Sequence, residues 1–155
     1  MAGRVKKTAY VRCRGGSINC AYGCIGCGMC ADACRTGAIS LKDAVPPVIN
    51  RDKCVGCGLC AGACPQGIIE IINADYNIQP KCCNKNAGRT ALDACPNSCI
   101  ACRLCEKNCP ADAVHVIDNC AVIDPAKCIC CGMCAVKCPR GVIRDLHGIM
   151  TGQDV

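Results

Sequence analysis

The apolar positions of this 155-residue chain come in short groups, without the long periodic stretches of large helices. Five groups rich in Ile, Val, Leu and Ala are typical of brief β-strands. They cover residues 38–41, 47–49, 68–71, 114–117 and 121–123. No group is long enough to span a membrane, and the charged start MAGRVKKTAYVRC leads into no apolar export segment. We therefore expect a soluble, cytoplasmic chain with no direct insertion into the membrane.

Cysteines fill much of the space between these groups, in a pattern that occurs four times. Each copy has the spacing C-x2-C-x2-C-x3-C, and a proline follows the last cysteine of the second, third and fourth copies. The four runs are Cys24, Cys27, Cys30 and Cys34; Cys54, Cys57, Cys60 and Cys64; Cys99, Cys102, Cys105 and Cys109; and Cys128, Cys131, Cys134 and Cys138. The residues between the third and fourth cysteine of each run predict one or two helical turns.

Three kinds of site compete for so many cysteines: a disulfide framework, zinc sites and iron–sulfur clusters. The chain has 23 cysteines, an odd number, and cytoplasmic thiols stay reduced, so a complete disulfide framework is disfavoured. Zinc usually takes two separated C-x2-C hooks, whereas the run found here, with its proline, is the ligand run of bacterial ferredoxins. The pattern predicts four [4Fe–4S] clusters, with a metal-storing or structural zinc protein as the alternative of another class.

In two-cluster ferredoxins the fourth cysteine of each run binds the other cluster, which fixes the predicted ligand sets. Runs one and two pair with each other, as do runs three and four, because 34 residues separate Cys64 from Cys99 and only 19 and 18 separate the runs within each pair. The first set is Cys24, Cys27, Cys30 and Cys64; the second is Cys54, Cys57, Cys60 and Cys34; the third is Cys99, Cys102, Cys105 and Cys138; the fourth is Cys128, Cys131, Cys134 and Cys109.

The predicted fold is α+β, with two tandem ferredoxin-like two-cluster domains of short strands and helical turns. Residues 1–75 form the first domain and residues 76–155 the second, and the polar segment 73–97 between them is expected to be a linker with some ordered turns. The chain has no Phe or Trp and only three Tyr residues, so it lacks the large rings of an ordinary core. We expect the clusters to stabilise the fold, because their binding free energy becomes folding free energy.

The net charge does not favour a nucleic-acid partner. The formal value of +6 treats every cysteine as neutral, whereas an oxidised cluster with four thiolates carries a charge of about −2. Four such clusters lower the net charge to about −2. The stacking aromatic residues of nucleic-acid-binding surfaces are missing as well.

The order of these motifs resembles the carboxy-terminal polyferredoxin region of RnfB, the B component of the Rnf complex. The resemblance rests on VRC, NCAYGCIGCGMC, the KC segment at Lys81 and Cys82, CPNSCIACRLCEKNCP and the last run, and it covers essentially the whole chain. It implies an electron-transfer component of an ion-translocating ferredoxin:NAD⁺ oxidoreductase, which takes electrons from reduced ferredoxin and passes them to membrane-embedded partners at the cytoplasmic face. The family's amino-terminal membrane helix is missing, so we expect an excised fragment or a soluble relative.

No catalytic residue is predicted, because the sequence contains neither a Gly-rich dinucleotide fingerprint nor a flavin motif. The expected chemistry is therefore electron transfer, with any reaction of NAD on another component of the complex. An iron–sulfur subunit of a hydrogenase, a formate dehydrogenase or a flavin-based bifurcating enzyme remains an alternative.

Seven cysteines remain outside the four runs: Cys13, Cys20, Cys82, Cys83, Cys95, Cys120 and Cys130. Cys20 and Cys95 each lie four residues before a run, and Cys13 and Cys82 form a second matched pair of positions. If the two halves pack together, Cys13, Cys20, Cys82 and Cys95 would form a fifth metal site for zinc or iron. Buried free thiols, and local disulfides Cys13–Cys20 and Cys82–Cys95, are the alternatives.

Overall fold

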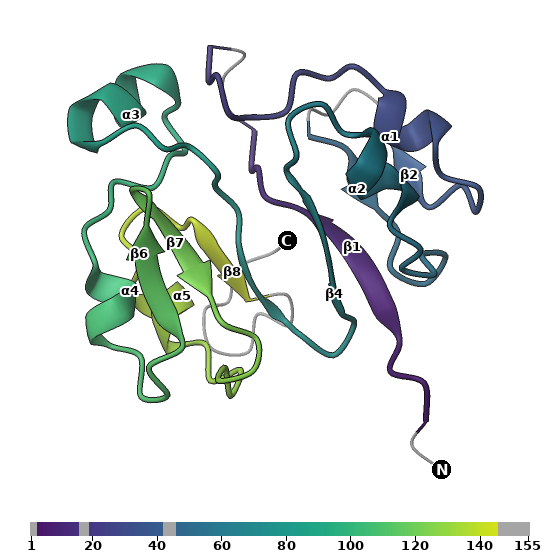
Figure 1. Cartoon of the computed structure of the whole chain (residues 1–155). Helices are drawn as coiled ribbons and strands as arrows, with labels where there is room; N and C mark the ends of the chain where they lie inside the picture. The colour runs from purple at the N-terminus through teal and green to yellow at the C-terminus, as the bar shows by residue number, and fades with distance from the viewer. Residues whose placement is uncertain (1–2, 16–18, 42–45, 146–155) are drawn as a thin grey trace.

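The computed structural model describes residues 3–15, 19–41 and 46–145 (Figure 1). Within these ranges the chain forms two halves of similar design, each with an inner strand pair, an outer strand pair and a short helix at each of its two cysteine runs. No helix in the described ranges is long and apolar enough to cross a membrane. The small α+β, ferredoxin-like fold predicted from the sequence is confirmed.

The outer strand pair of each half joins segments from its two ends. In the first half, β1 (Lys7–Val11) pairs antiparallel with β4 (Ile69–Asn73), and Val11 lies opposite Ile69. In the second half, β5 (Ile78–Pro80) pairs antiparallel with β8 (Ile143–Asp145). Both cysteine runs of a half lie between its two outer strands in the sequence, so this pairing brings the first run back to the second.

The inner strand pair of each half connects its two runs. These pairs are β2 (Ile39–Ser40) with β3 (Val48–Ile49), and β6 (Val114–Ile117) with β7 (Cys120–Ile123). Asp118 and Asn119 join β6 to β7, and their φ angles of 49° and 62° are those of the tight turn that suits a two-residue hairpin. The five apolar groups in the sequence correspond to β2, β3, β4, β6 and β7, whereas β1, β5 and β8 were not predicted.

Four short helices carry the predicted helical turns: α1 (Met29–Asp32), α2 (Leu59–Ala63), α4 (Leu104–Lys107) and α5 (Met133–Lys137). α1 contacts α2 and α4 contacts α5, so the two runs of each half lie side by side. The residue before each helix is left-handed: it is glycine in three cases, and Arg103 (φ 62°) takes this position before α4. A fifth helix, α3 (Gly88–Ala94), and strand β5 lie in the segment that the sequence indicated as a linker.

Each half has its own small core, made of aliphatic residues and cysteines. In the first, Val11, Ile39 and Ile69 pack with Cys30 and Cys60. In the second, Val114, Val142 and Ile143 pack with Cys105 and Cys134. The third cysteine of every run is therefore part of a core, which places the candidate ligands at the centre of each half.

Gly56, in the second run, lies close to β1. It is left-handed (φ 67°), and a Cβ atom there would lie 2.5 Å from Lys7 Cβ and 2.8 Å from the Lys7 carbonyl carbon. Gly67 is also left-handed (φ 63°) but has nothing within 4 Å of the same position. Both glycines relieve backbone strain, but only Gly56 also makes room for a strand.

We predict that Gly56→Ala lowers the free energy of unfolding by about 1–3 kcal/mol more than Gly67→Ala, because only the first overpacks the contact with β1. Anaerobic chemical denaturation of the two iron-loaded variants measures the difference. Equal losses would show that the approach to Lys7 does not constrain the fold.

Candidate iron–sulfur sites

Three of the four predicted ligand sets each line a single cavity. Cys24, Cys27, Cys30 and Cys64 line the first, together with apolar residues such as Ile25 and Leu41. Cys34, Cys54, Cys57 and Cys60 line the second. Cys99, Cys102, Cys105 and Cys138 line the third. Each cavity thus combines three cysteines of one run with the fourth cysteine of the partner run.

The fourth set consists of Cys109, Cys128, Cys131 and Cys134, and its thiols are linked through their electrostatic interactions. Burial raises the pKa of Cys128, and negative charge on Cys130 and on Cys109 adds to the effect. Burial, together with charges that include those of Cys128 and Cys131, raises the pKa of Cys134 to about 12. Cys109 and Cys128 thus interact across the two runs, as Cys24 and Cys64 do in the first set.

Backbone N–H groups point at the sulfur atoms in a repeated way. The fourth cysteine of a run accepts from the amide four residues later: Ala38 donates to Cys34 at 3.3 Å and Ala113 to Cys109 at 3.2 Å. The first cysteine accepts from the amide two residues later, as in the bond from Ala101 to Cys99 at 3.5 Å. Such donors stabilise a thiolate and orient it as a ligand.

Cys130 occupies one of these donor positions. Its amide donates to Cys128 at 3.5 Å, and its φ of 55° is left-handed, as is that of Gly56 at the equivalent position of the second run. Cys130 therefore contributes to the turn through its backbone, as Gly56 does, and nothing in this turn requires its thiol.

The donor sets fit [4Fe–4S] clusters in the chemistry of their ligands, with four thiols and amide donors aimed at sulfur. Burial raises the pKa of Cys105 to about 11. Three other ligands have a lowered pKa. A hydrogen bond with the Thr36 hydroxyl lowers that of Cys34, a hydrogen bond with Cys120 lowers that of Cys99 to about 6, and backbone N–H donors lower that of Cys54. Iron binding therefore has to displace protons from thiols with a raised pKa, such as Cys105. Among the described residues, no group of three or more Cys, His, Asp or Glu side chains is arranged to hold a single metal ion.

Comparison with known proteins agrees with this chemistry. The family model of a 4Fe-4S dicluster domain matches residues 23–68, and that of a 4Fe-4S binding domain matches residues 96–112. The chain is 40% identical over 110 residues to the B component of the Na⁺-translocating ferredoxin:NAD⁺ oxidoreductase complex of Acetobacterium woodii. It is 46% identical over 110 residues to the B component of the proton-translocating complex of Clostridium ljungdahlii. The chain is an RnfB-like [4Fe–4S] polyferredoxin region.

The matched part covers 71% of this polyferredoxin region but only 33% and 39% of the two relatives, so it spans less than half of their length. A formate dehydrogenase–heterodisulfide reductase–formylmethanofuran dehydrogenase complex from Methanospirillum hungatei contains a chain with 19% identity, covering 79% of this chain and 51% of that one. The TM-score of this match is 0.32. The resemblance predicted from the sequence is confirmed, and the region is a [4Fe–4S] electron-transfer domain.

The two halves of the polyferredoxin region meet along a boundary that we call the seam, formed by residues 12–15 and 20–23 on one side and residues 82–84 and 95–97 on the other. The guanidinium of Arg12 reaches from the first half to the second. It donates to Glu70 Oε1 of its own half at 3.2 Å, and to the Cys82 and Ala121 carbonyls of the second half at 3.3 Å and 3.5 Å. Asn97 crosses in the other direction and donates to the Gly15 carbonyl at 3.0 Å. These bonds fix one half against the other.

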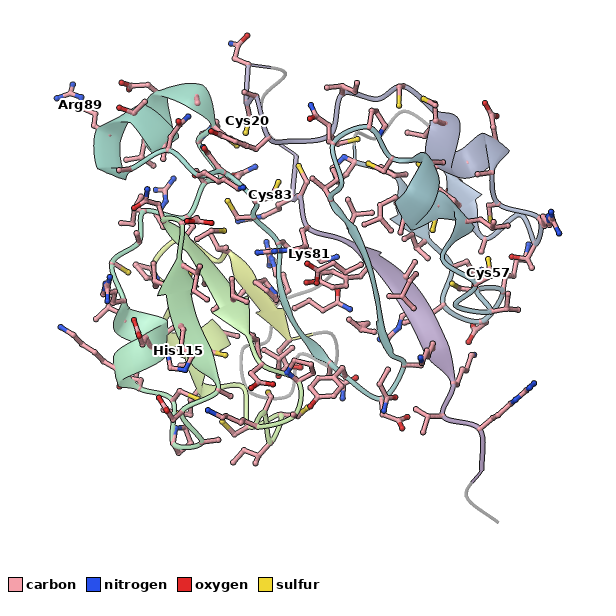
Figure 2. The ribbon with its side chains drawn as sticks, viewed as in Figure 1. Cys20, Cys57, Lys81, Cys83, Arg89 and His115 are labelled. Carbon is pink, nitrogen blue, oxygen red and sulfur yellow. The ribbon has the colours of Figure 1, made fainter. Side chains whose placement is uncertain are left out.

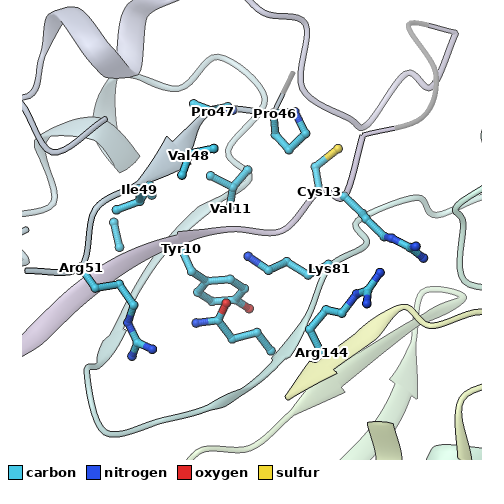
Figure 3. Close-up of a pocket in the computed structure, with 13 residues that line it drawn as sticks. Tyr10, Val11, Cys13, Pro46, Pro47, Val48, Ile49, Arg51, Lys81 and Arg144 are labelled. Atoms are coloured by element: carbon cyan, nitrogen blue, oxygen red, sulfur yellow. The ribbon is translucent and has the colours of Figure 1, made fainter. Parts of the chain in front are cut away.

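A cavity of about 410 Å³ opens beside the seam and carries positive charge (Figure 3). Its cationic lining consists of Arg14, Arg51, Lys81 and Arg144, opposite an apolar wall of Pro46, Pro47, Val48 and Ile49. Lys81 is half-buried, with its Nζ 5.4 Å from the centre of the Tyr10 ring. Burial and the charge of Arg51 together lower the pKa of Lys81 to about 8. Sequence reasoning missed this cavity, because its members come from four separate segments.

We predict that Arg12→Met lowers the free energy of unfolding of the polyferredoxin region by about 1–3 kcal/mol, because charged hydrogen bonds are lost and a buried set of acceptors is left behind. Arg103→Met is the matched control. Arg103 is an exposed arginine 3.7 Å from Glu106, and its loss should cost less than about 1 kcal/mol. Anaerobic denaturation of both variants tests this, and equal losses would contradict a locking role for Arg12.

Proposed function

We propose that this region binds four [4Fe–4S] clusters in two crossed pairs and relays low-potential electrons. In this proposal it receives them from reduced ferredoxin or a similar low-potential donor and passes them to membrane-embedded subunits of an Rnf-type complex at the cytoplasmic face of the membrane. The cluster assignment rests on three cavities, because each is lined by three cysteines of one run and one cysteine of the partner run. The names of the two similar proteins support the donor and the complex.

The proposed domains are residues 1–75 and 76–155, one crossed pair in each. The outer strand pairs β1–β4 and β5–β8 support this division, because each closes within its own half. When bound, the clusters would supply one-electron carriers. The chain itself holds the ligands, aims amide donors at sulfur and, through Arg12, fixes the spacing of the two pairs.

The surface also suits electron exchange with a protein donor. Cys27, Cys57 and Cys102, the second cysteines of their runs, are exposed. Apolar side chains surround these edges, among them Ile25 and Val55, which are 58% and 64% exposed. A donor protein can therefore approach the sulfur ligands closely at an apolar patch, as short-range electron transfer requires.

We predict that pairs of alanine substitutions reveal the crossed ligand sets. Cys30→Ala with Cys64→Ala should remove about four irons, because both residues serve one cluster, whereas Cys60→Ala with Cys64→Ala should remove about eight. Iron and acid-labile sulfide counts on anaerobically reconstituted protein give the answer. The reverse result, with the larger loss in the first pair, would show that each run holds its own cluster.

We also predict that the loaded chain oxidises reduced ferredoxin, because its exposed edges admit a donor. Stopped-flow absorbance of reduced ferredoxin mixed with the protein measures the rate. The Cys60→Ala/Cys64→Ala variant, which lacks the first pair, separates transfer into the first half from transfer into the second. A rate no higher than that of the iron-free chain would contradict the proposed relay.

A further inference from the structure

Four thiols outside the cluster runs converge on the seam, two from each half. In the first half, a Cβ atom on Gly23 would lie 3.5 Å from Cys13 Sγ and 3.6 Å from Cys20 Sγ, so both sulfur atoms border one small space. From the second half, Cys83 Sγ donates to the Tyr22 carbonyl at 3.0 Å and Cys95 Sγ to the Gly15 carbonyl at 3.7 Å. Figure 2 labels Cys20 and Cys83 where the two halves meet.

Two of these thiols have the local geometry of the cluster ligands. Cys13 accepts the N–H of Gly15 at 3.3 Å, two residues later in the chain. Cys95 accepts the N–H of Asn97 in the same way. The first cysteines of the third and fourth runs, Cys99 and Cys128, have this same turn. An amide donor at this position orients a thiolate for metal binding.

The structure distinguishes Cys83 from its neighbour Cys82. Cys82 Sγ accepts from the amides of Asn84 and Cys99 at 3.4 Å each and belongs to the core of the second half. Cys83 points the other way and packs against the core of the first half together with Cys13. Consecutive residues in extended backbone face opposite sides. Cys83 is therefore our candidate for this site in place of Cys82, which the sequence predicted.

Lys81 supplies a positive charge two residues from Cys83 in the sequence. It is half-buried, and its Nζ lies 5.4 Å from the centre of the Tyr10 ring. A cluster held by four thiolates keeps a net negative charge, which this cation would balance.

We propose that Cys13, Cys20, Cys83 and Cys95 bind a fifth [4Fe–4S] cluster, which joins the two cluster pairs. This inference rests on the proposed function.

A single metal ion needs sulfur atoms about 3.8 Å apart, set by metal–sulfur bonds of about 2.3 Å. No group of three ligand side chains in the described part of the chain is arranged for a single ion, whereas the four irons and four sulfides of a cluster hold ligand sulfurs wider apart.

The position of this site gives it a role as a bridge. Charge on Cys13 acts on Cys24 of the first set, so the site borders the first cluster cavity. On the other side, Cys82 is adjacent to Cys83 and accepts the amide of Cys99 of the third set. A one-electron carrier at the seam would therefore lie between the first and third clusters and shorten the path between the halves.

The test compares iron content in the full chain after anaerobic reconstitution. Wild type should bind about twenty irons and an equal number of sulfides, Cys83→Ala about sixteen, and Cys82→Ala, the adjacent control, about twenty. Cys13→Ala with Cys83→Ala should also keep about sixteen, because residues from both halves serve one cluster. EPR spin counts after dithionite reduction should fall by one cluster in Cys83→Ala and in the double variant, but not in Cys82→Ala. Circular dichroism checks that all three variants remain folded.

The outcomes separate this inference from the four-cluster proposal. About sixteen irons in wild type, with or without one bound zinc, would overturn the fifth cluster and leave the four-cluster proposal intact. A full wild-type count that Cys83→Ala does not lower would also overturn the seam assignment. Fewer than about sixteen irons in wild type would overturn the four-cluster proposal itself.

Discussion

Cysteines from two separate runs have to meet at one cavity, and this requirement determines how each half folds. Cys64 reaches the cavity of the first run only if the second run returns to it, and the pairing of β1 with β4 makes this return. The second half meets the same requirement with β5 and β8. With no Phe or Trp to build a large core, short strands and aliphatic side chains around the sulfur atoms are what remains to hold each half.

Much of each half could be predicted from its sequence, because cluster-ligand spacing is a local pattern. The four helical turns and the inner strands follow directly from the runs and the apolar groups between them. β5 and β8 were missed because three-residue strands show no clear alternation, and Pro80 at the end of β5 argues against a strand. α3 was missed because it begins at Gly88 in a segment rich in Asn and Lys, whose composition is typical of a loop.

The seam could be predicted only in part. Matched positions in the internal repeat predicted a site of Cys13, Cys20, Cys82 and Cys95, and our proposed site has Cys83 in place of Cys82. The choice between Cys82 and Cys83 depends on which face of an extended segment turns toward the other half, and no local pattern contains that information. Arg12 illustrates the same limit: an arginine near a charged amino terminus is usually solvated, yet here three acceptors from distant segments surround it.

Crossed cluster pairs that are joined at the seam require iron at defined places in the chain. Anomalous X-ray scattering at the iron edge, from anaerobically grown crystals of the loaded chain, locates iron without reference to the ligands. We expect one multi-iron peak in each of the cavities lined by cysteines of two runs, another within the fourth set, and one between Cys13, Cys20, Cys83 and Cys95. Peaks that contact cysteines of one run alone, or scattering that appears only at the zinc edge, would rule out this arrangement.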